Sequence, residues 1–202
     1  MKCALPILFA LLATPALAEG ARELDAHEHG VGALNIAIDG DTVAMELHAP
    51  GADIVGFEYE ATSAEDRAAI DAAVALLAKP LDLFVLPTTA ECSVTKASAG
   101  LESDEGHEDH AEGDEHDDHA DGHAAGDGHD DHDDHAEASH TEFHAEYMLT
   151  CGNPGAMNGI DFAYFSIFEN ALELEVQIVS ASGAKAFEVE RNMPTLDLRG
   201  MF

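Results

Sequence analysis

The sequence predicts an α+β fold, in which a mostly antiparallel sheet carries one main helix and is interrupted by a long His/Asp-rich insert. Three observations support this prediction. Apolar residues alternate with polar ones in several short stretches, one stretch repeats its apolar residues at helical spacing, and residues 100–140 contain almost no large apolar side chains. A period of two indicates half-buried strands, and a period near 3.6 indicates a helix. The insert cannot bury enough apolar surface to offset its conformational entropy, so we expect it to be disordered.

A hairpin is the first element predicted. Apolar residues alternate over residues 34–38 and again over residues 43–47, and Asp39-Gly40 lies between the two stretches. Asp-Gly between alternating stretches is typical of a two-residue hairpin turn.

One helix is predicted between residue 63 and Pro80. Ser63 is a suitable N-cap, and the acidic residues that follow it favour the start of a helix. Ile70, Val74 and Leu77 then recur at helical spacing until Pro80 ends the helix. Residues 83–86 and 92–97 are expected to be short extended segments.

The C-terminal half is predicted to consist of strands. Residues 143–149 alternate, residues 160–168 are apolar on both faces as in a central strand, and residues 172–178 alternate as in a strand with one wet face. Phe187 and Val189 indicate a further strand. One helix among six or seven strands gives the α+β class.

The N-terminus predicts export. Lys2, an apolar run over residues 4–12 and Ala16-Leu17-Ala18 together resemble a secretory signal peptide covering residues 1–18. The apolar run is shorter than the roughly 20 residues that a membrane-spanning helix needs. Residues 19–202 are therefore expected to form a single exported domain in the periplasm, interrupted at about residues 100–140, without stable membrane insertion.

Two cysteines remain after removal of the signal peptide, namely Cys92 and Cys151. An even number in an exported chain favours a disulfide, because that compartment is oxidising. The alternative is that both are thiolate metal ligands, which their wide spacing disfavours.

The net charge is strongly negative, at −33 from 41 acidic and 8 basic residues. Such a chain repels nucleic acid and anionic membrane surfaces, and it attracts cations. The expected partners are divalent metal ions.

Histidine is concentrated in and beside the insert. Imidazole nitrogen suits zinc, nickel, copper and cobalt, and His-rich tracts are a recognised metal-binding composition. Several pairs are three residues apart, so one helical turn would let a pair chelate one ion, and the intervening aspartates would complete or orient the site. We therefore expect several Zn²⁺ ions, with Ni²⁺, Cu²⁺ or Co²⁺ as alternatives. The candidate ligands in this region are His107, His110, His116, His119, His123, His129, His132, His135, His140 and His144.

Two further candidate ligands, His27 and His29, precede the first predicted strand. With His144 and Glu146, they would form a firmer site on the folded body. His48 shares a strand face with Glu46, but a lone histidine there is more often an ordinary surface or core residue.

Several segments resemble the ZrgA family, whose members are periplasmic proteins associated with zinc uptake in Gram-negative bacteria. They are Ala26-His27-Glu28-His29-Gly30, Leu34 to Gly40, Ile54 to Glu58, Cys92 and Thr150 to Pro154. The resemblance covers essentially the whole mature chain. It implies an accessory zinc-binding role in which metal passes to an ABC-type importer or its binding protein.

Two other functions use similar residues. A nickel or copper buffer would use the same ligands. A zinc-dependent hydrolase would need three fixed ligands, an open position and a general base. The sequence has no His-Glu-x-x-His motif, no nucleophile elbow and no Gly-rich phosphate loop. We therefore expect a binding protein and not an enzyme.

Overall fold

Two sheets dominate the fold. A computed structural model of the chain describes residues 28–103 and 140–201. Within these ranges a six-stranded sheet has the order β4-β5-β2-β1-β7-β8, and a three-stranded sheet has the order β3-β6-β9. Neighbouring strands are antiparallel except β1 and β7, which are parallel. The strands are β1 Val31–Asp39, β2 Thr42–Pro50, β3 Phe84–Val85, β4 Cys92–Ser103, β5 Thr141–Cys151, β6 Gly159–Phe162, β7 Glu173–Ser180, β8 Gly183–Glu190 and β9 Thr195–Asp197.

One long helix accompanies the sheets. Helix α2 spans Ala64–Leu77, and the Ser63 side chain accepts a hydrogen bond from the backbone N–H of Asp66 at 3.0 Å, as an N-cap does. The remaining helical segments in the described ranges are single turns: α1 Gly51–Ile54, α3 Pro80–Leu83, α4 Tyr164–Ile167 and the 3₁₀ turns η1 Thr88–Ala90 and η2 Pro154–Ala156. The predicted hairpin, main helix and mostly antiparallel sheet are confirmed.

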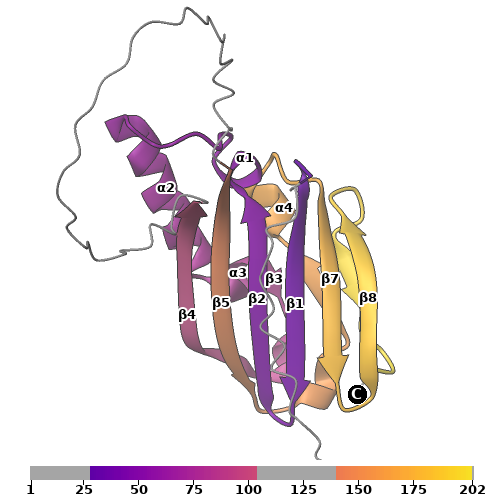
Figure 1. The fold of residues 1–202 in the computed structure, drawn as a ribbon. Coiled ribbons are helices and arrows are strands. Elements are labelled where there is room, and N and C mark those ends of the chain that lie inside the picture. Colours follow the sequence, from indigo (N-terminus) through magenta and orange to yellow (C-terminus); the bar gives the residue numbers. More distant parts are fainter. Residues whose placement is uncertain (1–27, 104–139, 202) are drawn as a thin grey trace, which may run out of the picture.

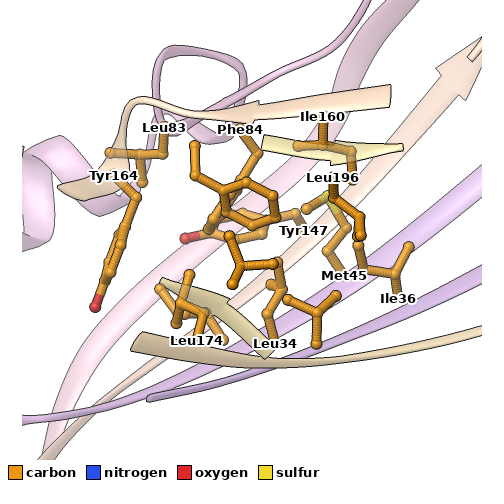
Figure 2. Close-up of a cluster of buried hydrophobic side chains, with 14 of the residues drawn as sticks. Leu34, Ile36, Met45, Leu83, Phe84, Tyr147, Ile160, Tyr164, Leu174 and Leu196 are labelled. Atoms are coloured by element: carbon orange, nitrogen blue, oxygen red, sulfur yellow. The ribbon is translucent and has the colours of Figure 1, made fainter. Parts of the chain in front are cut away.

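The core lies between the two sheets. Figure 1 shows the six-stranded sheet face-on, with α3, α4 and β3 behind it. In Figure 2, Leu34, Met45 and Tyr147 of the large sheet meet Phe84, Ile160 and Leu196 of the small one. The buried side chains alternate along β1, β2 and β5, so the intervening side chains lie on the opposite face. We call this opposite face of the six-stranded sheet the open face.

The segment from Ile160 to Phe168 differs from the predicted central strand. Only β6 is extended, and it lies in the small sheet; the chain then turns through α4. The turn buries Tyr164, Phe165 and Phe168 against the core, where Tyr164 stacks on Phe84 with ring centroids 6.1 Å apart. A short, fully apolar run has no period that separates a strand from a buried helical turn.

A disulfide joins the strands that flank the insert. Cys92 lies directly opposite Cys151 in the β4–β5 register, and the two form a disulfide. Strand β4 continues to Ser103, so residues 100–103 belong to the sheet and not to the predicted insert. The reason is packing: Leu101 lies opposite Phe143 and contacts the core. The predicted signal peptide and the rest of the insert lie outside the described residues.

Gly51 allows a close contact where β2 ends. A Cβ there would collide with the Thr141 hydroxyl and would lie 2.7 Å from the carbonyl oxygen of Phe57. We expect Gly51→Ala to lower the free energy of unfolding by about 1–3 kcal/mol, as overpacking does. Gly100→Ala is the matched control, because a Cβ there has no neighbour within 4 Å; alanine in a strand should be neutral or more stable by about 0.5–1 kcal/mol. Equal denaturation midpoints for the two variants would contradict this account.

Candidate metal centre

Strand β5 presents alternating histidine and glutamate on the open face. Phe143, Ala145 and Tyr147 are buried, whereas His144 is half-buried and Glu146 is exposed. Because side chains alternate across a strand, Glu142, His144 and Glu146 share the open face. One strand therefore carries nitrogen and oxygen donors in a row.

The register with β2 places a second imidazole beside the first. His48 lies directly opposite His144, and Glu46 lies directly opposite Glu146. The two imidazole rings stack with centroids 4.5 Å apart at an interplanar angle of 27°. Residues nearly a hundred positions apart in the chain thus form one cluster.

Glu46 joins the two imidazoles. Its Oε1 lies 3.3 Å from Nε2 of His48 and 3.1 Å from Nε2 of His144. Glu46, His48 and His144 each offer one ligand atom, and these three atoms all lie within 4.8 Å of one another. Two Nε2 atoms and one carboxylate oxygen therefore converge on a small volume.

The other ring nitrogens face further carboxylates. Nδ1 of His48 lies 3.3 Å from Oε2 of Glu142, and Nδ1 of His144 lies 3.4 Å from Oε1 of Glu102. Metal-binding histidines commonly donate their second N–H to a carboxylate, which fixes the tautomer and increases the basicity of the ligating nitrogen. Both histidines of the cluster have such a partner.

The carboxylates set the charge of the cluster. The hydrogen bond to Glu142 raises the pKa of His48 despite partial burial, and Glu46 adds to the effect. Burial would raise the pKa of Glu46, but its hydrogen bonds to His48 and His144 outweigh burial and lower that pKa. Glutamates outnumber basic groups here, so the site favours cations.

The donor set suits zinc. Zn²⁺ binds imidazole nitrogen and carboxylate oxygen in tetrahedral sites, and a three-ligand site leaves one position for water or another ligand. Calcium sites use oxygen donors and do not call for imidazole. The cluster therefore offers the donors that a borderline-soft divalent ion prefers.

The sequence-predicted ligands are divided between two places. His144 belongs to the cluster with Glu46 and His48. Glu146 forms an ion pair with Lys96 at 3.3 Å, and His29 and His140 both contact Glu58, so His29, His144 and Glu146 do not form one group. The other predicted ligands lie outside the described residues: His27, His107, His110, His116, His119, His123, His129, His132 and His135.

Sequence reasoning did not select Glu46, His48 or Glu58. The signal for the first two was present, because Glu46 and His48 alternate with buried Met45 and Leu47. The sequence did not reveal the β2–β5 register, and this register places His48 directly opposite His144.

A comparison with protein families decides the assignment. The family model described as ZrgA family zinc uptake protein matches residues 26–198. The chain belongs to the ZrgA family. All residues of the cluster lie inside the matched region, as does Glu58. A search of curated proteins found no match. In the described part of this ZrgA family chain, no helix is long and apolar enough to cross a membrane.

Proposed function

We propose that this protein captures Zn²⁺ in the periplasm for uptake or storage, and that Glu46, His48 and His144 form a binding site on its folded body. The observation that carries the proposal is the convergence of Nε2 of His48 and Nε2 of His144 on one carboxylate oxygen, Oε1 of Glu46. The description of the family as zinc uptake proteins supports zinc as the cargo. The His-rich insert would add further sites, and these would be weaker if, as its composition predicts, binding must also order it.

The position of the cluster suits a carrier. The side chains are partly exposed, at 26% for His48, 17% for His144 and 34% for Glu46. Glu46 also borders a hollow of about 460 Å³ on the open face. An ion can enter and leave such a site without unfolding the protein, which delivery requires.

Export, transfer and the absence of catalysis are parts of the same proposal. A disulfide at Cys92–Cys151 is suited to an oxidising compartment, which supports the periplasm. The description of the family as zinc uptake proteins supports delivery of zinc to an importer, and we propose that this importer is of the ABC type. We assign the site to binding and not to catalysis, because uptake requires reversible release of the ion unchanged.

Competition for zinc with a chromophoric chelator tests the site. At less than one equivalent of zinc the tightest site fills first, and a preformed cluster should be tighter than an insert whose composition predicts disorder. Changes in groups that only orient a ligand lower metal affinity roughly 10–100-fold, so Glu46→Gln should lower the affinity of the full chain at least tenfold.

Glu175→Gln is the matched control for charge. Glu175 is exposed on β7, two strands from β2, and it does not contact the cluster. The Glu175→Gln variant should bind zinc as the wild type does. Equal affinities for the Glu46 and Glu175 variants would refute this site. A preference for Ni²⁺ over Zn²⁺ in the same competition would refute zinc as the cargo.

A further inference from the structure

A second histidine–carboxylate cluster lies where the chain returns from the insert. His29 precedes β1, Glu58 follows α1, and His140 directly precedes β5. Oε2 of Glu58 lies 3.1 Å from Nε2 of His29 and 3.2 Å from Nδ1 of His140. Two imidazoles from distant segments therefore converge on a single oxygen atom.

A buried aspartate lies behind this cluster. Asp53 is only 2% exposed, and its Oδ1 accepts a hydrogen bond of 2.7 Å from the backbone N–H of Gly30, the residue after His29. Its Oδ2 is buried and has no hydrogen-bond partner among the described residues. Leaving a buried carboxylate oxygen without a partner is unfavourable, so a cation close to Asp53 would offset part of the cost of its burial.

Glu58 is also largely shielded from solvent. Its side chain is 13% exposed, and its buried Oε1 makes no hydrogen bond of normal geometry, although the backbone N–H of Ala52 is close enough to favour the charged form. Burial would raise the pKa of Glu58, but the hydrogen bonds to His29 and His140 outweigh burial and lower it. Burial raises the pKa of Asp53, and the nearby charge of Glu58 adds to that effect.

Within the part of the chain that the structure describes, the two carboxylates have no permanent positive partner. Among residues 28–103 and 140–201, no Lys or Arg forms an ion pair with Glu58 or Asp53. Within the described residues, the basic side chains in contact with Glu58 are the imidazoles of His29 and His140. A divalent cation held by both imidazoles would supply positive charge beside these two carboxylates.

We propose that His29, Glu58 and His140 form a second site for a divalent transition-metal ion such as Zn²⁺, with Asp53 supplying negative charge behind it. The inference rests on the proposed function and adds to it a location at the base of the insert. The ligand set is the one that zinc accepts, with two imidazole nitrogens and carboxylate oxygen. His29 and His140 are exposed, at 66% and 52%, so their rings can turn toward an ion that enters from solvent.

Occupation of this site would join three segments of the chain. The ion would tie the start of β1 and the segment after α1 to the end of the insert at His140. His140 and His144 are four residues apart, with Glu142, a partner of His48, between them. At about 3.3 Å per residue, the backbones of His140 and His144 lie roughly 13 Å apart. Along the chain, the second site thus lies between the insert and the first cluster, where it would receive ions that leave the insert.

Residue-resolved modification with diethyl pyrocarbonate tests the inference on the full chain. The reagent acylates neutral, accessible imidazole, and mass spectrometry of peptides reports each histidine separately. In the wild type at pH 7.5, adding Zn²⁺ should slow the modification of His29 and His140 severalfold. In Glu58→Gln this zinc-dependent protection should be lost, whereas the protection of His48 and His144 should persist.

A second variant avoids any effect on folding. His29→Gln changes an exposed side chain, and it should abolish the zinc-dependent protection of His140. Glu175→Gln should leave the protection of all four histidines unchanged. If zinc protects His48 and His144 but not His29 and His140, or protects His140 equally in the wild type and in His29→Gln, the second site does not exist and the proposed function stands. If zinc protects none of the four, both fail.

Discussion

Replacing residues 104–139 with the dipeptide Asn-Gly is expected to leave the body folded and to remove most of its zinc capacity. Ser103 lies opposite Thr141 in the β4–β5 register, so Asn-Gly followed by His140 gives a three-residue hairpin loop. The disulfide between Cys92 and Cys151 holds the other end of the same strand pair. Eight of the thirteen histidines are lost with the segment, so the number of zinc ions bound should fall to those held by the body.

Calorimetry measures both effects. Thermal unfolding should remain cooperative, because residues outside the replaced segment form a large core between the two sheets. Zinc titration should show at least one ion that is still bound tightly. The control keeps the segment at full length and changes its eight histidines to glutamine, which separates the effect of histidine from that of loop length. A deletion variant without a cooperative transition, or one that retains the full number of ions, would contradict the division of the chain into a body and an insert.

The sequence predicted most of the large sheet, because its strands have one wet face. Leu174, Val176 and Ile178 alternate with polar residues, and β7 follows that alternation. The N-cap at Ser63 likewise marked the start of α2. The small sheet was predicted only in part. Residues 83–86 were expected to be extended, and β3 lies among them, but β9 has three residues and is too short to show a period.

The metal centre was predicted only in part, because its ligands come from different strands. His29, His140 and His144 were candidates from composition, yet their grouping depends on contacts with Glu58 and Glu46 that arise from the fold. The sequence did not indicate that β1 pairs in parallel with β7. Because β1 also pairs with β2, it lies between these two strands at the centre of the sheet. Periodicity gives the face of a side chain, and only the register gives its neighbour.

Proton competition at His48 is expected to make zinc binding by the first cluster strongly dependent on pH. Zinc requires neutral imidazole, whose ordinary pKa is about 6.5. The carboxylates of Glu142 and Glu46 raise the pKa of His48 above this value, so protons should begin to compete near neutrality. Zinc affinity should therefore fall steeply between about pH 7.5 and pH 5.5, with more than one proton taken up per ion released. A site made mainly of carboxylates would keep its metal over this range, because free carboxylates titrate near pH 4.

The stability of the protein should depend on pH in opposite directions with and without zinc. A folded-state pKa of His48 above its unfolded value means that protonated His48 stabilises the metal-free protein at low pH; this contribution is lost as pH rises through the folded pKa. Zinc stabilises the folded protein only where the imidazoles are neutral, so the zinc-dependent increase in Tm should be large at pH 7.5 and nearly absent at pH 5.5. His48→Gln should weaken both effects, whereas Glu175→Gln should preserve both. For the wild type and each variant, Tm is measured by thermal unfolding at pH 5.5 and at pH 7.5, with and without zinc. A zinc-dependent increase in Tm that is equal at pH 5.5 and pH 7.5 would show that imidazole is not a principal ligand of the ion.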